Sequence, residues 1–254
     1  MKFKLGKKPA RPGAMKLKFA DVFDATHLPV PPHSFGHQSL MANHQWGMLA
    51  NDQVGDCVLA GGGHESMLFA LEGGRPFISF SDKSTLSDYT AITGYNPNDP
   101  NSDQGTDMVE AAKYRRICGL LDANGVRHKI DAYAEITRGD LTQVTLATWL
   151  FGACGCGFAV PDSVQDQFDA GQPFDVVPGA QIEGGHYMPC IGRNSNGYYV
   201  LVTWGKTVTA SPRFMKKYMD EAVAYISRDV IVAKTQKTQE GFDLAALDNF
   251  LAHL

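Results

Sequence analysis

A run of small and apolar residues that contains three consecutive glycines strongly limits what this chain can fold into. The run from Cys57 to Leu71 reads CVLAGGGHESMLFAL, and Gly73-Gly74 follows it closely. Its length and composition predict a helix that the glycine pair ends. Because each glycine inside a helix costs about 1 kcal/mol relative to alanine, we expect close packing against another element to offset that cost. The sequence therefore predicts a buried helix with Cys57 at its N-terminus.

The two halves of the chain differ in the elements that they predict. Capped or periodic segments predict a short helix within residues 77–95, beginning at Ser81 or Ser84, and helices at 106–121 and 141–150. Strands are expected at residues 126–136, 157–160, 185–192, 198–205 and 222–226, with a short helix at 212–220. The turn at 194–197 reads NSNG, and an Asn-Gly turn between two apolar runs is the strongest local hairpin signal. We therefore expect a mainly helical N-terminal half and a sheet-rich C-terminal half.

Composition excludes several classes of protein. Hydrophobic residues make up 44% of the chain and charged residues 20%, which is typical of a globular domain and not of a disordered or fibrous chain. The longest apolar run, residues 146–160, is broken by glycines and falls short of the roughly 20 residues of a membrane helix. No basic-then-apolar signal segment opens the chain. We therefore expect no membrane contact and a cytoplasmic location as synthesised.

Neither the cysteines nor the histidines follow a metal or disulfide pattern. The chain has five cysteines, an odd number that is too sparse for a disulfide scaffold. Cys154 and Cys156 lack the spacing and the second pair of a zinc site. A loop from Asp99 to Glu110 carries acids at calcium-ligand positions, but Gln104 stands where glycine is needed. A cluster of four histidines in the lead-in has no metal spacing: His27, His33, His37 and His44. The sequence predicts no metal ion and no cofactor.

The first twenty residues form a basic arm in front of an acidic body. They hold seven of the 23 Lys and Arg residues and no acid, so the remainder has 16 basic against 27 acidic residues. Such an arm can bind nucleic acid, an acidic protein surface or the chain's own body. A flexible solubilising tail is the plain alternative.

We expect four segments along the chain. The arm, residues 1–20, is followed by a lead-in over 21–45, whose Leu-Pro-Val-Pro-Pro run favours extended, polyproline-like backbone. The main domain covers residues 46–235. A tail over 236–254 ends in an amphipathic helix, Leu244–Leu254.

Cys57 is the strongest candidate for a reactive group. A thiol at a helix N-terminus lies at the positive end of the helix dipole, which lowers its pKa and favours the nucleophilic thiolate. A thiolate also needs a base, usually a histidine from a distant segment. His186 begins the hairpin, and Gly184 and Gly185 leave space around it. The residues therefore suggest Cys57 and His186 as a catalytic dyad.

The order of these motifs resembles that of papain-like cysteine peptidases. The similar segments are NDQVGDCVLA at 51–60, FSDKSTL at 80–86, GTDM at 105–108, GHY at 185–187 and the pair Trp204-Gly205. The resemblance spans roughly residues 46–228. It implies an α+β fold of two lobes, a helical N-terminal lobe and an antiparallel-sheet C-terminal lobe, with the dyad across the cleft between them. With its Pro-rich lead-in, the pattern also resembles papain-like proteins carried by bacteriophages and prophages.

The resemblance assigns a role to each matching residue. Cys57 matches the nucleophile, and His186 matches the general base that accepts its proton. Asn51 stands where the family has the glutamine of the oxyanion hole, six residues before the cysteine, and it is one methylene shorter. Gln53 is a second candidate for that role. An oxyanion donor is worth about 10²–10³ in rate.

The third catalytic position departs from the family. The family places an asparagine two residues before Trp-Gly, where it orients the histidine, and this chain has Val202 there. Valine cannot form that hydrogen bond. Thr203 could, but adjacent residues on a strand point to opposite faces, so the strand register decides.

Two functional classes follow from these observations. In the first, the chain is a thiol hydrolase of peptide or amide bonds that acts on a peptide or protein substrate. In the second, it is a catalytically impaired structural component of a bacteriophage particle. It would then be incorporated in a virion and would contact other subunits through the arm and the tail. Val202 and the arm favour the second class, and the joint presence of Cys57 and His186 favours the first. The enzyme fold is our preferred interpretation, with activity left open.

Overall fold

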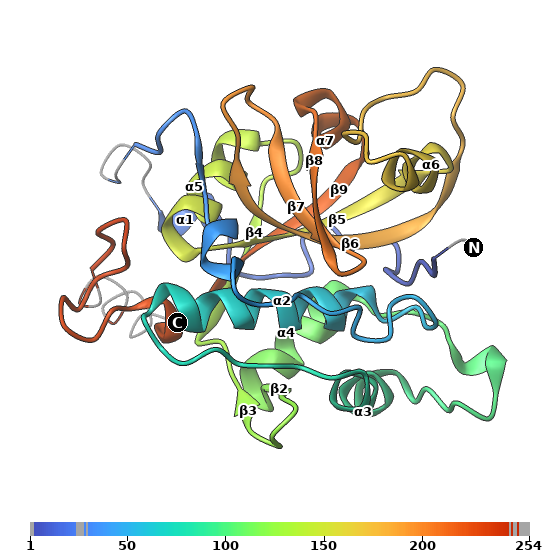
Figure 1. The fold of residues 1–254 in the computed structure, drawn as a ribbon, viewed down its shortest axis with the longest axis horizontal. Coiled ribbons are helices and arrows are strands. Elements are labelled where there is room, and N and C mark those ends of the chain that lie inside the picture. The colour runs from blue at the N-terminus through green and yellow to red at the C-terminus, as the bar shows by residue number, and fades with distance from the viewer. Residues whose placement is uncertain (1–2, 24–27, 29, 244, 246–247, 249–254) are drawn as a thin grey trace.

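A seven-stranded antiparallel sheet and a long helix packed against it organise the fold (Figure 1). The computed structural model describes residues 3–23, 28, 30–243, 245 and 248. The sheet has the order β4-β9-β5-β6-β7-β8, and β1 pairs with β6 outside this path. The strands are β1 (Phe35–Gly36), β4 (Ala132–Ile136), β5 (Cys154–Pro161), β6 (Ile182–Arg193), β7 (Tyr199–Thr203), β8 (Lys206–Ala210) and β9 (Met219–Ile226).

The helices divide between two lobes. The helical lobe holds α2 (Cys57–Glu72), α3 (Asp82–Thr93), α4 (Met108–Ile117) and a small ribbon of β2 (Leu120–Leu121) and β3 (Arg127–His128). The sheet lobe carries α1 (Phe19–Val22), α5 (Leu141–Phe151), α6 (Ser163–Asp169) and α7 (Pro212–Tyr218). Single 3₁₀ turns are η1 (Gln38–Met41), η2 (Pro100–Ser102) and η3 (Arg228–Val230). The α+β class with a helical and an antiparallel-sheet lobe is confirmed.

The packing of α2 against the sheet explains its glycines. A Cβ on Gly61 would stand 2.4 Å from the ring of Tyr187 on β6, a distance that no side chain can occupy. The helix therefore approaches the sheet more closely than an alanine would allow, and this packing offsets the weak helix propensity of glycine. The prediction of a buried helix that begins at Cys57 is confirmed.

Two predicted elements have different bounds in the structure. The helix expected to reach Leu121 ends at Ile117, because Gly119 adopts a φ of +81° and the next two residues pair with β3. The single strand expected over 126–136 is split into β3 and β4, which belong to different sheets. Both differences arise from pairing partners that local sequence does not reveal.

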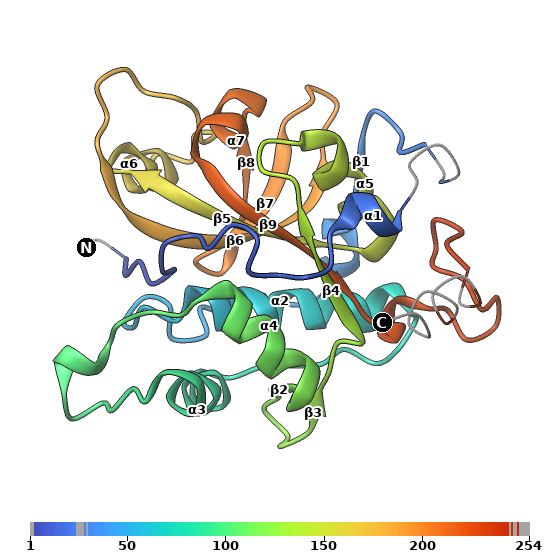
Figure 2. The same cartoon turned by 180° about the vertical axis from the view of Figure 1, so that it is seen from behind.

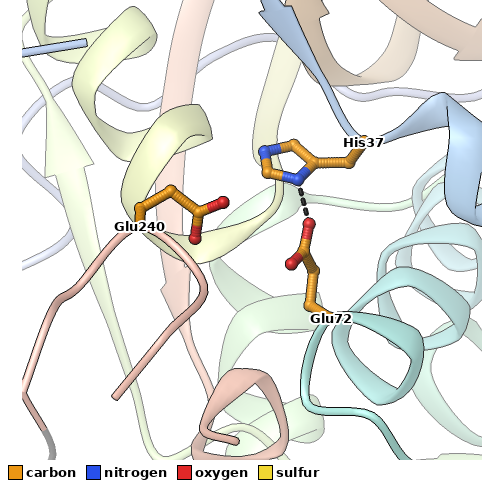
Figure 3. A group of neighbouring side chains, drawn as sticks. All are labelled: His37, Glu72 and Glu240. Carbon is orange, nitrogen blue, oxygen red and sulfur yellow. Dashed lines mark hydrogen bonds and ion pairs between the residues drawn. The ribbon is translucent and has the colours of Figure 1, made fainter.

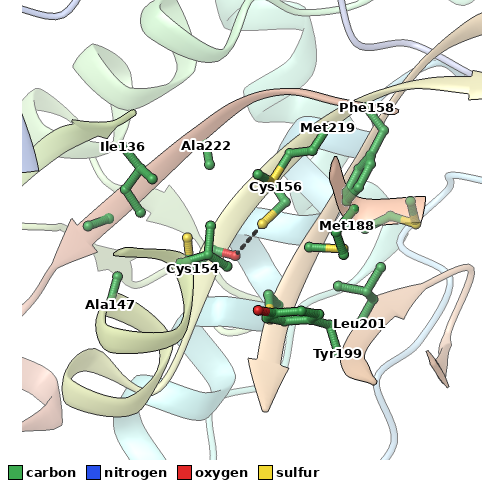
Figure 4. Close-up of a cluster of buried hydrophobic side chains, with 14 of the residues drawn as sticks. Ile136, Ala147, Cys154, Cys156, Phe158, Met188, Tyr199, Leu201, Met219 and Ala222 are labelled. Atoms are coloured by element: carbon green, nitrogen blue, oxygen red, sulfur yellow. Dashed lines mark hydrogen bonds between the residues drawn. The ribbon is translucent and has the colours of Figure 1, made fainter. Parts of the chain in front are cut away.

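Three of the five cysteines serve as core side chains. Cys154, Cys156 and Cys190 are buried and free, and all three belong to one hydrophobic cluster. Figure 4 shows Cys154 and Cys156 within it. Cys118 is free and partly exposed. These three thiols therefore act as small apolar side chains of the core.

The C-terminal segment turns back onto the body. Phe242 is buried against Phe151 and Phe23, with ring centroids 5.3 Å and 6.0 Å away. The helix expected over Leu244–Leu254 falls largely outside the described residues. Within the described part of the chain, no helix has both the length and the apolar character needed to cross a bilayer.

Candidate active site

The start of α2 meets strand β6 at the interface of the two lobes. Cys57 is the first residue of α2, and its sulfur lies against the backbone amides of Tyr187 and Gly6. Tyr187 directly follows His186, so the fold brings the two predicted dyad residues onto facing elements. Both are buried, Cys57 at 1% and His186 at 0% exposure. No hydrogen bond joins the thiol to the imidazole in the part of the chain that the structure describes.

The imidazole of His186 is held by two neighbours. Its Nε2 lies 2.7 Å from Oγ1 of Thr203, and its ring stacks on Trp204 with centroids 4.7 Å apart. Its Nδ1 is buried, and no described residue forms a hydrogen bond with it. When Nε2 carries the proton and donates it to the threonine oxygen, Nδ1 is left with a free lone pair. Burial lowers the pKa of His186 to about 3, so the ring is neutral at neutral pH.

The register of the β7–β8 hairpin decides which residue reaches the histidine. Thr203 pairs with Lys206 across a two-residue turn of Trp204 and Gly205, which both have positive φ. Val202 is fully buried in the hydrophobic cluster that includes α2. Because adjacent strand residues point to opposite faces, this register turns Thr203 toward His186. The hydrogen bond that Val202 could not make is therefore made by its neighbour.

The thiol of Cys57 is not poised as a thiolate in this arrangement. Burial raises its pKa to about 12, and the backbone amides of Tyr187 and Gly6 offset this effect only in part. The expectation of a lowered pKa at the helix N-terminus is therefore wrong for this conformation. The reason is that desolvation of the charged form outweighs the helix dipole when water is excluded.

The two candidate oxyanion donors lie in different surroundings. Asn51 is buried beside Cys57 in the chain, and its Nδ2 donates to the carbonyl of Val54 at 3.2 Å. An amide nitrogen has two protons, so this bond leaves a second donor. The side chain of Gln53 is exposed. Of the two amides, only Asn51 shares the buried environment of the thiol.

The residue before the cysteine also influences the site. Asp56 is fully buried, and burial raises the pKa of its carboxyl well above the usual range, while the amide of Asn51 acts in the opposite direction. A neutral carboxyl at this position adds no negative charge next to Cys57. An ionised Asp56 would disfavour the thiolate.

The basic arm runs between the sheet and the helical lobe (Figure 2), where its backbone bonds to both. The backbone N–H of Lys7 donates to Gly185 at 3.0 Å, and the N–H of Thr106 donates to Gly6 at 2.7 Å. The N–H of Lys8 returns to the carbonyl of Thr106 at 2.9 Å. The arm is thus bound as an extended peptide between the two lobes, with one partner on each.

The backbone of the arm is in close contact with the start of α2. A Cβ on Gly6 would stand 1.7 Å from the carbonyl oxygen of Gly55, two residues before Cys57. A Cβ on Gly185 would stand 2.1 Å from the carbonyl oxygen of Lys7. The arm can therefore lie over the thiol only because glycine occupies these positions.

The side chain of Lys7 is completely buried under the sheet. Its ammonium lies 3.1 Å from Asp220 and 3.0 Å from Glu221 on β9, with its side chain at 0% exposure. Its methylene groups contact Gly157 at a point where a Cβ would clash with them. A lysine can be buried at this cost only when carboxylates pair with it.

The arm also covers the far side of the histidine. Phe3 stacks on Trp204 with ring centroids 4.8 Å apart, so the indole lies between Phe3 and His186. The backbone of Phe3 exchanges two hydrogen bonds with the side-chain amide of Gln165. These contacts add to the exclusion of water from the imidazole.

The later part of the arm forms ion pairs with acidic side chains of the same chain. Arg11 binds Asp107 and Glu110, and Lys18 binds Glu135. Of the partners considered for the basic arm, the structure therefore provides the chain's own acidic body. Asp107 also caps α4, which uses one of the acids of the calcium-like loop. Asp103 of that loop accepts from Gly55 and from the Tyr89 hydroxyl.

Sequence reasoning did not identify Lys7, Thr106, Asp220 or Glu221 as part of this site. The available signal was the charge contrast between the arm and the body, which predicted contact without a location. The pairing of residues 213 positions apart depends on the tertiary fold.

The overall structure is similar to solved cysteine proteases. Xylellain, a cysteine protease from Xylella fastidiosa, matches with a TM-score of 0.66 at 12% identity, over 88% of this chain and 96% of that one. A proCathepsin B from Trypanosoma congolense matches with a TM-score of 0.63 at 12% identity, over 87% and 86%. Digestive procathepsin L 3 of Tenebrio molitor matches with a TM-score of 0.61 at 16% identity, over 83% and 74%. The sequence itself matches no protein-family model and no curated protein. The chain has a papain-like fold, as the order of its motifs predicted.

Proposed function

We propose that this papain-fold chain is a thiol hydrolase of peptide or amide bonds, held in a latent form by its own N-terminal arm. One observation carries the proposal. The backbone of Gly6 and Lys7 is bound as an extended peptide directly over Cys57, between a glycine carbonyl of β6 and the backbone of Thr106. A surface that binds an extended peptide there is suited to present a peptide bond to the thiol.

The dyad residues would act in turn. The sulfur of Cys57 attacks the substrate carbonyl carbon while its proton passes to Nδ1 of His186, and the C–N bond then breaks as the imidazolium protonates the departing amine. Water next attacks the thioester, with its proton taken by His186, and the thiol returns as the acid leaves. The backbone N–H of Cys57 and the side-chain amide of Asn51 are the candidate donors to the oxyanion. Thr203 would hold the ring through Nε2.

In this proposal, the docked arm keeps the thiol and the imidazole unreactive by excluding water and substrate. Burial keeps the thiol protonated, with a pKa of about 12, and keeps the imidazole neutral, with a pKa of about 3. Displacement of residues 3–8 would admit water and substrate to both groups. The pKa of the thiol would then fall and that of the imidazole would rise, toward the values that favour proton transfer between them.

A one-methyl substitution tests this proposal in the full chain. In Gly6→Ala the new Cβ would overlap the carbonyl oxygen of Gly55, so the arm cannot dock while the dyad and the net charge stay unchanged. We expect iodoacetamide to label Cys57 at neutral pH at least about 100-fold faster in this variant, because a solvated thiol has a pKa near 8.5 or lower. Mass spectrometry of the labelled peptide measures the rate. Hydrolysis of fluorogenic peptides should appear together with fast labelling.

Three matched variants separate the possible outcomes. Lys8→Ala, at the exposed neighbouring position, should label like the unaltered chain. In the Gly6→Ala background, His186→Ala should remove labelling below pH 8, and Cys57→Ser should abolish hydrolysis. If hydrogen exchange reports a released arm and Cys57 still labels slowly without dependence on His186, the proposal is wrong. The impaired structural component of a phage particle would then be the better interpretation.

A further inference from the structure

A second group of ionisable side chains lies away from the dyad, where three distant segments meet. His37 comes from the lead-in between β1 and η1, Glu72 is the last residue of α2, and Glu240 belongs to the returning C-terminal segment. One ligand atom from each lies within 4.8 Å of the other two (Figure 3). His37 and Glu72 are buried, and Glu240 is partly buried.

The hydrogen bonds of His37 direct one ring nitrogen into this group. Its Nε2 lies 3.2 Å from the backbone carbonyl of Thr148, which can only accept, so Nε2 carries a proton. Nδ1 forms a hydrogen bond with the carboxylate of Glu72, so the metal-free chain holds a proton between these two atoms (Figure 3). A bound cation would displace this proton and leave the Nδ1 lone pair free to coordinate it. A backbone carbonyl behind the outer nitrogen is the usual arrangement of a metal-binding histidine, because it fixes the tautomer and the ring orientation.

The carboxylate of Glu72 has an oxygen without a partner. Its Oε2 is buried and accepts no hydrogen bond from any residue in the described part of the chain, and the residue is only 3% exposed. Figure 3 shows this carboxylate directed toward the space between His37 and Glu240. A buried carboxylate oxygen that accepts no hydrogen bond destabilises the fold. A cation bound at this point would accept its lone pair and remove that cost.

The local charge also favours a cation. Glu72 stands at the C-terminal end of α2, where the helix dipole is negative. Among the described residues, no lysine or arginine forms an ion pair with Glu72 or Glu240. A divalent cation with two carboxylates and a neutral imidazole would leave no net charge.

We propose that His37, Glu72 and Glu240 bind a divalent first-row transition-metal ion, with zinc as the best match to one imidazole and two carboxylates. Zinc lies about 2.0–2.2 Å from such ligands, and tetrahedral ligands at that distance stand roughly 3.4 Å apart. The three atoms, all within 4.8 Å, need only small side-chain movements to reach this spacing. Water would complete the fourth position. Spacing rules do not detect the site, because its ligands come from three segments and two of them are glutamates.

The bound ion would hold the C-terminal segment against the body of the protein. Gln239, beside Glu240, donates to the backbone carbonyl of Glu72 at 3.0 Å, and Phe242 packs on Phe151. A metal at the cluster would join this segment and the lead-in to the end of the active-site helix. We therefore expect metal binding to protect residues 231–243 from proteolysis, since Lys234 and Lys237 are exposed there.

Titration of the full chain with ZnCl₂ after dialysis against a chelator tests the proposal. We expect one zinc per chain by calorimetry, a higher Tm, and slower tryptic cleavage at Lys234 and Lys237. CoCl₂ should give a d–d spectrum without thiolate-to-cobalt charge transfer, because no cysteine is a ligand. None of these measurements depends on hydrolytic activity, so they test the metal site even if the hydrolase proposal is wrong.

Paired variants identify the ligands. Glu240→Gln and His37→Gln should each weaken binding at least about tenfold, whereas Asp243→Asn and His33→Gln should leave it unchanged. Glu240→Gln changes a partly exposed side chain, so it should fold even if His37→Gln does not. Zinc binding that is lost in Cys57→Ser, that is unaffected by Glu240→Gln, or that is absent from the unaltered chain would overturn the proposal.

Discussion

Two buried cations, Arg115 in the core and Lys7 at the lobe interface, each pair with carboxylates but have different roles in the protein. Arg115 pairs with Glu65 and stacks on Tyr225, with its guanidinium 4.0 Å from the ring centroid, and the Tyr187 hydroxyl donates to the same glutamate. Lys7 pairs with two carboxylates on β9. Both cations lie almost entirely out of water, and both are compensated by carboxylates.

The difference lies in the segment that carries each cation. Arg115 and Glu65 belong to α4 and α2, which hold the helical lobe together, so their pair can be lost only when the lobe loosens. Lys7 belongs to an arm that meets the body through a few backbone bonds and side chains. We infer that the core pair sets the stability of the fold and that the arm pair sets access to the thiol.

The largest effect should follow from breaking the core pair. In Arg115→Met the carboxylate of Glu65 is left buried without its cation, and we expect the free energy of unfolding to fall by about 3–5 kcal/mol. Urea denaturation followed by circular dichroism measures this change. Arg116→Met alters the exposed neighbour and should change stability by less than about 0.5 kcal/mol. Equal losses in the two variants would contradict the role of the buried pair.

Breaking the arm pair should open the site without unfolding the protein. We expect Lys7→Met to weaken docking of the arm by about 2 kcal/mol, which corresponds to roughly 30-fold faster labelling of Cys57. Lys8→Met, at the exposed neighbouring position, is the matched control. The midpoint of urea unfolding should stay nearly the same in both. A Lys7→Met protein that loses stability as Arg115→Met does would remove the distinction between the two cations.

The acids that hold Lys7 should also influence which peptides are cut. Once the arm is released, Asp220 and Glu221 lie beside the path that the arm occupied, and a basic substrate side chain could take the place of the lysine. In the Gly6→Ala background we expect kcat/KM to favour a peptide with lysine over one with norleucine, by about tenfold. This preference should disappear in Asp220→Asn/Glu221→Gln. Equal preference before and after that double substitution would show that the pocket does not select charge.

The hydrogen bond to the histidine should have a smaller effect. A net hydrogen bond is worth about 1 kcal/mol, so Thr203→Val in the Gly6→Ala background should slow hydrolysis about fivefold to tenfold. Thr203→Ser keeps the hydroxyl and should restore the rate and the pH profile. Rescue by serine distinguishes orientation of the ring from simple packing, because valine is closer to threonine in shape than serine is.

Local sequence signals predicted the elements that support the dyad. The helix from Cys57 and the hairpin that carries His186 depend on short patterns, a glycine stop and an Asn-Gly turn, and both are confirmed. Helix α6 and strand β8 were missed because neither carries such a signal. The bounds near Leu121 were wrong because a partner strand overrides helix propensity.

Long-range information explains what the sequence did not predict. The choice of Thr203 over Val202 depends on the register of a hairpin, and a one-residue shift reverses which side chain faces the histidine. The raised pKa of Cys57 depends on burial where the two lobes meet, while Gly6 and Lys7 of the arm, about 50 residues earlier in the chain, act in the opposite direction. The cluster of His37, Glu72 and Glu240 depends on the return of the C-terminal segment.

The smallest expected effect concerns the outer part of the arm. Burial alone would raise the pKa of Asp107, but hydrogen bonds from Arg11 and from the backbone of α4 lower it below its usual value. A lowered pKa in the docked state contributes stability that is present above the ordinary pKa near 3.9 and is lost as the pH falls through the lowered value. Acid should therefore loosen the arm only below about pH 4.

Hydrogen exchange of residues 8–18 at pH 3 and at pH 6 measures this loosening. Because Arg11 is half-exposed, Arg11→Gln should change protection at pH 6 by less than about twofold. It should also reduce the difference between the two pH values, since the partner that lowers the pKa of Asp107 is gone. If the variant instead releases the arm completely at pH 6, the contacts of Arg11 are what keep the arm docked. Lys7 would then contribute little to docking of the arm, which would contradict the proposed difference between the two buried cations.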